Sequence, residues 1–252
     1  EMSASLVGSE MCIRDSNYTV FNTYEICAIE ISGKDVLRKR NLVRPAEKRY
    51  NVYKCSPWNQ ITKGEKKIMA FVHLHTHTEY SLLDGSNKIK EYVSRVKELG
   101  MNSAAITDHG NMYGVVEFYK TAKAADINPV IGCEIYVAPN SRFDRETSHG
   151  EDRYYHLILL AENNTGYANL MKIVSIGFTE GYYYRPRVDF ETLQKYHEGL
   201  ICLSACLAGE VPRYIVRGFY EEAKGIAKKY QDCFGKDNYF LCLLYTSPSP
   251  RD

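Results

Sequence analysis

The chain has 252 residues, of which 44% are hydrophobic and 25% charged, and its formal net charge is +1. This composition is typical of a globular protein, and the length suits one large α/β domain or two smaller ones. No run approaches the roughly 18 apolar residues of a membrane span, and the near-neutral charge gives no general reason to expect a nucleic-acid binder.

The first and last segments differ in character from the middle of the chain. Residues 3–16 and 242–252 resemble translated sequencing-adapter read-through, and neither has helical or strand periodicity. We therefore expect residues 242–252 to be an artefactual tail.

The basic stretch before the middle is also unusual. Between Lys34 and Lys54, eight Lys or Arg residues accompany two acids, which is the charge pattern of a nucleic-acid arm. The Lys-Gly-Glu-Lys-Lys run just before Met69, however, is what a translated ribosome-binding site gives. We expect Met69 to be the authentic start, residues 1–68 to be a non-native or disordered extension that does not pack on the domain, and residues 69–241 to be the folded domain.

Strand and helix patterns alternate along this domain. The first strand covers 71–77, and a helix follows at about 87–99 with Ser86 as its N-cap and Gly100 as its C-terminal stop. Later segments follow the same alternation: strands at 103–107, 129–137, 154–160, 200–204 and from 239, and helices at 113–125, 165–176, 209–217 and 219–232. This order predicts an α/β fold with a parallel sheet, either open or closed into a barrel.

The first strand carries three histidines at alternate positions: His73, His75 and His77. Side chains two residues apart on a strand point to the same face. Neutral imidazole is the commonest metal ligand, so a solvated strand explains this triplet less well than a metal site does.

Further ligand-type residues occur near the ends of the later strands. In parallel α/β folds this edge of the sheet is where chemistry is placed. N, O and S donors in this number exceed one tetrahedral site and indicate a multinuclear cluster, which suits phosphoester hydrolysis. In chain order these residues lie in His75-Thr-His77 with Asp84 after it, in Thr-Asp108-His109, at Glu134, at His156 and in Ser-Ala-Cys206.

These motifs together resemble the PHP (polymerase and histidinol phosphatase) domain. The segments FVHLHTHTEYSLLDG, AAITDHGNMYG, GYYYRPRVD and LSACLAGE resemble more closely the PHP domain at the N-terminus of bacterial DNA polymerase III alpha subunits, over essentially all of 69–241. The resemblance implies a distorted (βα)7-type PHP barrel, here truncated before its last strands, with a trinuclear zinc or manganese site. The seven candidate ligands that it implies are His75, His77, Asp84, His109, Glu134, His156 and Cys206. His73 lies outside the family pattern.

The resemblance also implies a function. Some PHP relatives are phosphatases or 3′–5′ exonucleases, and others keep the domain only as a scaffold. The parent protein would be a DNA-directed DNA polymerase that uses Mg²⁺ and works with DNA and other replisome subunits. The family's late Asp-x-His ligand pair and the polymerase palm would fall beyond Leu241, so we expect the fragment itself to bind metal weakly and to be inactive.

Two arginines in Tyr-Tyr-Tyr-Arg-Pro-Arg, Arg185 and Arg187, are candidates for contacting a phosphate or a nucleic-acid strand. A well-packed loop in which they pair with local acids is the alternative.

Three other functions stay open: a stand-alone PHP phosphoesterase similar to histidinol phosphatase, a non-catalytic PHP scaffold and, more distantly, an amidohydrolase barrel. Eight scattered cysteines without a Cys-x-x-Cys pair, and the absence of a signal-peptide pattern, indicate free thiols in the cytoplasm and no membrane partner.

Overall fold

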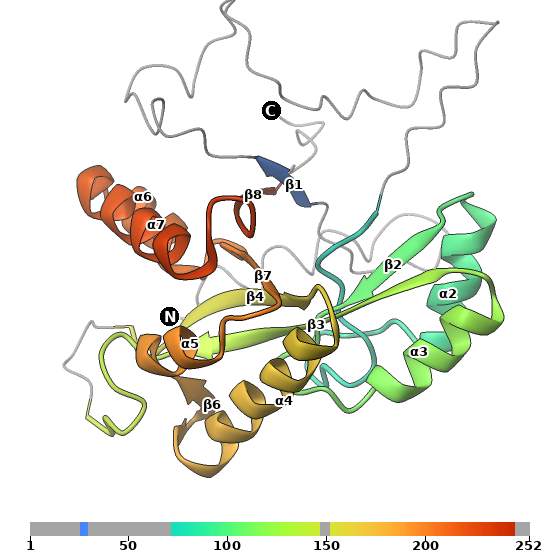
Figure 1. The fold of residues 1–252 in the computed structure, drawn as a ribbon, viewed down its shortest axis with the longest axis horizontal. Helices are drawn as coiled ribbons and strands as arrows, with labels where there is room; N and C mark the ends of the chain where they lie inside the picture. The colour runs from blue at the N-terminus through green and yellow to red at the C-terminus, as the bar shows by residue number, and fades with distance from the viewer. Residues whose placement is uncertain (1–25, 30–71, 147–151, 245–252) are drawn as a thin grey trace, which may run out of the picture.

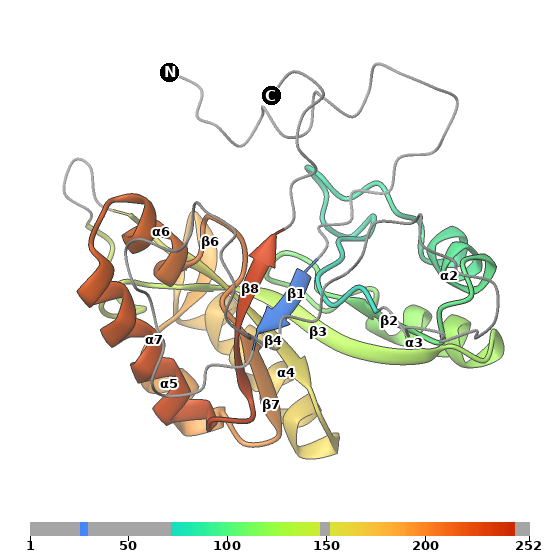
Figure 2. The same ribbon diagram turned by 90° about the horizontal axis from the view of Figure 1, so that it is seen from above.

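The computed structural model describes residues 26–29, 72–146 and 152–244. Within these residues eight strands form one sheet, in the order β1-β8-β7-β4-β3-β6-β5, with β2 paired to the first half of β3. The sheet curls but stays open, as half of a barrel (Figures 1 and 2). The α/β class and the incomplete barrel expected from the sequence are confirmed.

The first half of the fold repeats a helix-then-strand unit twice. Its elements are α2 (Ile89–Glu98), β2 (Ser103–Ile106), α3 (Val115–Ala124) and β3 (Asn128–Val137). Helix α2 buries Ile89, Tyr92, Val93 and Val96, which recur at helical spacing and pack against β2 and α3. Gly100 follows the helix with φ +74°, a conformation that favours glycine, so the predicted stop is confirmed.

The second half continues the sheet and covers one of its faces. Its elements are β4 (Tyr155–Ala161), α4 (Asn164–Thr179), β5 (Tyr182–Tyr183), β6 (Arg185–Val188), α5 (Phe190–Tyr196), β7 (Leu200–Leu203), α6 (Glu210–Val216), α7 (Tyr220–Phe234) and β8 (Tyr239–Leu244). None of the described helices is both long enough and apolar enough to span a membrane.

Alternation along β3 and β4 separates the two faces of the sheet. Cys133, Ile135, Leu157 and Leu159 join the main core with helices α4, α5 and α7. The residues between them on β3 and β4 point to the opposite face, which those helices do not cover. Glu134 and His156 belong to this second set, so the sheet itself directs them to the same side.

The sheet is mixed and not parallel throughout. Strand β4 runs antiparallel to both β3 and β7, whereas β7 and β8 are parallel. No helix lies in the described part of the connection between β3 and β4, and without a crossover helix the chain can return antiparallel. The prediction of an all-parallel sheet is therefore wrong at β4.

The predicted strand at 71–77 is not a regular strand in its described part, from residue 72 onward. Two backbone bonds join it to β2 and its end, from Ala105 N–H to His73 C=O and from Thr107 N–H to Thr76 C=O. The Thr107 hydroxyl accepts a hydrogen bond from Thr76 N–H, so a side chain replaces a main-chain partner in the ladder. Ser86 is likewise not the N-cap of α2, a position that Lys88 occupies.

Strand β1 (Ile26–Ile29) lies in the part of the chain before Met69. It pairs antiparallel with residues 241–244 of β8, so these four residues join the sheet and β8 continues past the expected end of the domain at Leu241 (Figure 2). A sheet edge presents free N–H and C=O groups to any segment with strand propensity, and Ile-Cys-Ala-Ile is such a segment. The rest of 1–68 and residues 245–252 lie outside the described residues.

Candidate metal centre

Six of the seven candidate ligands meet at one place. Ligand atoms of His75, His77 and Glu134 lie within 4.8 Å of one another, and two more such groups overlap with this one. The second group comprises His77, Asp84 and His109, and the third His109, Glu134 and His156. Cys206 lies at the edge of the cluster, with its Sγ 3.8 Å from Nδ1 of His156. His73 belongs to none of these groups.

Glu134 is the centre of the arrangement, and its side chain is only 1% exposed. One oxygen, Oε1, lies 2.9 Å from His156 Nδ1 and 3.5 Å from His75 Nε2. The other, Oε2, lies 2.5 Å from His109 Nδ1 and 3.5 Å from His77 Nε2. A single buried carboxylate thus faces four imidazoles, as a bridging ligand would.

Three backbone features bring these side chains together. Tyr136 of β3 pairs with His156 of β4, which makes His156 a diagonal neighbour of Glu134 on the same face. Residues 108–110 lie beside β3, with bonds from Glu134 N–H to Asp108 C=O and from Gly110 N–H to Glu134 C=O. Because β4 is antiparallel, its first residues and the last residues of β3 lie at the same end of the sheet.

Gly110 makes the close approach of this loop possible. Its φ is +61°, and a Cβ at this position would lie 2.8 Å from a Pro186 carbon and 2.9 Å from a ring carbon of Tyr136. A side chain would push the loop away from β3 and His109 away from Glu134.

A buried hydrogen-bond network behind the cluster orients His77. The Ser81 hydroxyl donates to Asp108 Oδ1 at 2.7 Å and lies 3.0 Å from His77 Nδ1. Its only proton is used on Asp108, so it can only accept from His77, and the proton of this neutral ring resides on Nδ1. The lone pair of His77 Nε2 therefore points into the cluster, as a metal ligand requires.

Replacing Ser81 by alanine is expected to lower metal affinity by about 10–100-fold while leaving the fold intact. The change removes the acceptor that holds His77 in its ligating tautomer. Isothermal titration with zinc measures the effect, and Ser141→Ala, on a surface loop, is the matched control. Equal affinity in Ser81→Ala and the unaltered chain would show that this network does not support the ligands.

Burial and charge divide the imidazoles into two pairs. Burial lowers the pKa of His75, and it lowers that of His77 to about 3, because the opposing attraction of Glu134 is smaller. Burial also acts to lower the pKa of His109 and of His156, but the acidic groups around these two rings raise it by more. Contacts with Asp84 and Glu134 raise the pKa of His109 to about 9, and Glu134 together with Cys206 raises that of His156 to about 10.

The carboxylates shift in the complementary direction. The neighbouring imidazoles, His156 first, hold the pKa of Glu134 well below its usual range in spite of complete burial. Burial acts to raise the pKa of Asp84, which is less buried than Glu134, but the contact with His109 outweighs it, so the pKa is lowered. At neutral pH the cluster without metal therefore contains two imidazolium cations and two carboxylates, and its charges balance.

This donor set fits divalent metal ions. The Nε2 atoms of His75 and His77 are 2.9 Å apart, close to the separation of about 3.3 Å for two nitrogens on one tetrahedral zinc. His109 Nδ1 and Glu134 Oε2 are buried and lie 2.5 Å from each other, as an ion pair between two ligand atoms. A divalent cation would take the place of the proton that the two atoms share.

The two candidate phosphate-binding arginines have different environments. Arg187 is 1% exposed, and its guanidinium donates to the backbone carbonyls of Gly181, Arg153, Arg142 and Asp144. Because its N–H groups are used by these backbone carbonyls, Arg187 is a poor candidate for a phosphate contact. Arg185 is half-buried and lies over the ring of Tyr136, 5.6 Å from its centre.

Arg187→Met is therefore expected to destabilise the protein by about 2–4 kcal/mol, because several buried carbonyls lose their donor at once. Arg185→Met, two residues away, should change the free energy of unfolding by less than about 1 kcal/mol. Urea denaturation followed by circular dichroism compares the two. A loss that is no larger for Arg187→Met than for Arg185→Met would contradict the structural role.

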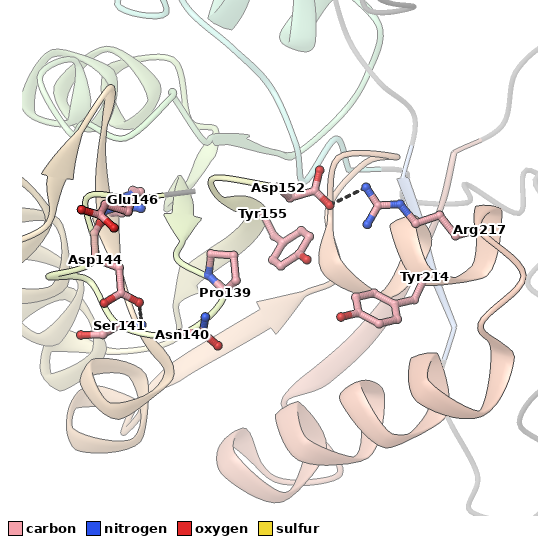
Figure 3. Close-up of a pocket in the computed structure, with 10 residues that line it drawn as sticks. Pro139, Asn140, Ser141, Asp144, Glu146, Asp152, Tyr155, Tyr214 and Arg217 are labelled. Atoms are coloured by element: carbon pink, nitrogen blue, oxygen red, sulfur yellow. Dashed lines mark hydrogen bonds and ion pairs between the residues drawn. The ribbon is translucent and has the colours of Figure 1, made fainter. Parts of the chain in front are cut away.

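A separate cavity of about 290 Å³ lies away from the candidate ligands. It is lined by Pro139, Asn140, Ser141, Asp144, Glu146, Asp152, Tyr155, Arg187, Tyr214 and Arg217 (Figure 3). Asp152 and Arg217 form an ion pair at 2.8 Å, and the Arg187 guanidinium faces carbonyls. Its cationic groups are thus already paired, and it contains none of the candidate ligands.

Sequence reasoning missed the groups behind the ligands. Asp108 stands next to His109 in Thr-Asp-His, so its position was a usable signal, and burial raises its pKa even though Thr78 and Ser81 donate to it. Ser81 lies in an ordinary turn sequence and gives no such signal. Tyr136 and Tyr154, whose rings lie 5.2 Å and 6.0 Å from that of His156, were also not singled out.

Comparison with known proteins gives consistent matches. The sequence model of the family described as "PHP domain" matches residues 73–243. DNA polymerase III subunit alpha of Treponema pallidum is 53% identical over 173 residues, 69% of this chain, and that of Borreliella burgdorferi is 49% identical over 169 residues, 67% of this chain. The chain spans about 15% of the length of these curated relatives.

One solved structure, described as a metal-dependent phosphoesterase from Bifidobacterium adolescentis, is 19% identical with a TM-score of 0.31 and covers 41% of this chain and 32% of its own.

Proposed function

The chain belongs to the PHP domain family, and from this premise we propose that its histidine–carboxylate cluster binds divalent metal ions and hydrolyses phosphoester bonds. The observation that carries the proposal is the single buried carboxylate of Glu134 in contact with four imidazoles. Such an arrangement costs stability in a protein that uses it only for packing, because the attraction between paired buried charges often does not repay the cost of removing them from water.

The proposed roles of the residues follow from their positions. His75, His77 and Glu134 would hold one ion, and Asp84, His109, His156 and the shared carboxylate of Glu134 would supply ligands for further ions, with one nitrogen from each ring and with Cys206 at the edge. When bound, divalent ions in such a site polarise phosphoryl oxygens and lower the pKa of water.

Arg185 would contact a substrate phosphate beside this cluster. It lies over Tyr136, whose ring is 5.2 Å from that of His156, so its charge lies near the proposed ions without touching them. Asp84 is the most exposed ligand, with 47% of its side chain accessible, and marks the side from which a substrate enters.

Zinc and manganese are the proposed metals. Imidazole nitrogens suit zinc, and the two carboxylates also suit manganese. For the chain as printed we propose weak metal binding and little hydrolysis, because its sequence contains no Asp-x-His segment and the family resemblance implies two ligands from one.

We propose that the whole protein is a DNA-directed DNA polymerase of the polymerase III alpha type, cytoplasmic, dependent on Mg²⁺ for synthesis, and associated with DNA and other replisome subunits. The support is 53% and 49% identity to such subunits over about two thirds of this chain.

The test combines metal analysis with two substrates. The chain is loaded with zinc or manganese, its metal content is measured by mass spectrometry, and hydrolysis of bis(p-nitrophenyl) phosphate and of a 3′-labelled oligonucleotide is followed. A version extended with the residues that follow the matched region in the Treponema pallidum relative should bind more metal and hydrolyse both substrates faster, if these residues supply the two further ligands that the resemblance implies. Absence of bound metal in both versions would support a scaffold and reject the proposal.

A further inference from the structure

We propose that the aromatic and arginine side chains at the start of β4 and on the β5–β6 hairpin form a track that guides the end of a single DNA strand to the metal centre. This inference rests on the proposed function, since it names the form of substrate that the centre receives. Four side chains make up the track: Tyr154 and Arg185 nearest the centre, and Arg153 and Tyr184 farther out.

The inner part of the track touches the metal centre. The rings of Tyr136 and Tyr154 lie 5.0 Å apart, and Tyr154 stacks on His156 at 6.0 Å. Arg185 lies over the Tyr136 ring and contacts Tyr154. Only the Tyr154 side chain would therefore separate a phosphate bound by Arg185 from His156, a proposed metal ligand.

The outer part continues from the inner part through peptide bonds. Arg153 precedes Tyr154 and Tyr184 precedes Arg185, so each outer residue lies within about 4 Å of an inner one along the backbone. The guanidinium of Arg153 lies 4.3 Å from the centre of the Tyr184 ring. Tyr184 is 61% exposed, so it also offers area for a base to stack on.

The backbone at Tyr184 is held in a conformation that its side chain disfavours. Its φ is +60°, which is uncommon for a bulky residue and costs of order 1 kcal/mol. The turn between β5 and β6 would suit glycine or asparagine better. The ring contacts Tyr183, with 4.7 Å between the ring centres, and Arg153, but it stays 61% exposed, so a surface role explains it.

Other arginines of this region donate to backbone carbonyls, as Arg145 and Arg187 do, or pair with acids. Arg142, Arg213 and Arg217 all pair with carboxylates. Among the described residues, neither Arg153 nor Arg185 forms an ion pair with an acid, and each lies over a tyrosine ring instead. Alternating aromatic rings and unpaired cations bind single strands, whose bases are free to stack, in preference to duplexes.

The test measures binding and does not depend on catalysis. A fluorescent dT12 oligonucleotide is titrated with the full chain in EDTA, and its anisotropy gives the dissociation constant for the unaltered chain, Tyr184→Asn and Arg153→Gln. Asparagine tolerates the positive φ, so Tyr184→Asn removes the ring without adding strain. Each variant is expected to bind about tenfold more weakly, and Arg153→Gln should also lower the slope of log K against log salt by about 0.7.

Matched controls come from the same molecule. Tyr182→Asn removes an exposed tyrosine from the same hairpin, where it packs on Phe178, and Arg95→Gln removes one exposed charge from α2. Both should bind dT12 within twofold of the unaltered chain, and a 12-base-pair duplex should bind more weakly than dT12. Equal losses in variants and controls, or tighter binding of the duplex, would overturn the inference. Metal content is measured separately: if the chain binds metal but the DNA results contradict the track, only this inference fails, whereas absence of bound metal counts against the proposed function.

Discussion

Replacing Glu134 by glutamine is expected to reduce zinc or manganese affinity more than about 100-fold. Losing a residue that only supports a ligand typically costs 10–100-fold, and Glu134 contacts all four imidazoles directly. The amide keeps the shape of the side chain but provides one neutral oxygen in place of a shared negative charge. Competition with a chromogenic chelator at pH 7.5 measures the affinity.

Glu210→Gln is the matched control for this experiment. Glu210 is also a partly buried carboxylate, but it accepts a hydrogen bond from Tyr230 in the helical layer and lies outside the cluster. It should leave metal affinity unchanged within about twofold. Circular dichroism of both variants verifies that they fold. If Glu134→Gln bound metal as tightly as Glu210→Gln, Glu134 would not be a ligand.

Metal affinity is also expected to rise about 100-fold per pH unit between pH 6.5 and 8. Without metal, His109 and His156 hold protons, with pKa values raised to about 9 and 10. Both protons must leave before the rings can bind metal, so raising the pH toward 9 removes a competitor and tightens binding. The lowered pKa values of His75 and His77 mean that these rings are already neutral in this range.

Calorimetry in buffers of different ionisation enthalpy counts the protons directly. At pH 7.5 about two protons should be released when metal binds, and the Cys206→Ser background excludes a contribution from the thiol. Histidines with an ordinary pKa near 6.5 would release almost none at this pH. A release well below one proton would show that the cluster does not hold its charges as the structure indicates.

Several features of the fold were readable from local sequence. Helix α2 was expected from an apolar stripe that includes Val93 and Val96, and its end from Gly100, because periodicity and turn chemistry act over one or two turns. The meeting of His109 and Glu134 with the first histidines was also anticipated, because the carboxyl ends of parallel strands lie at one edge of a sheet. His156 joins them from the start of the antiparallel β4, which that reasoning did not cover. Short elements were missed: β5 and β6 have two and four residues, too few to show a period.

Only the tertiary structure decided how these pieces meet. The sequence could not show that β4 runs antiparallel, which places His156 opposite the end of β3, since strand direction depends on pairing with distant segments. Nor could it separate Arg187, which binds backbone carbonyls inside the protein, from Arg185, which stays over Tyr136 beside the metal centre. The sequence by itself determined which residues can bind metal, because that is a property of side-chain type. Their order around Glu134, and the Ser81–Asp108 network that orients His77, depend on long-range packing and hydrogen bonds that no local pattern encodes.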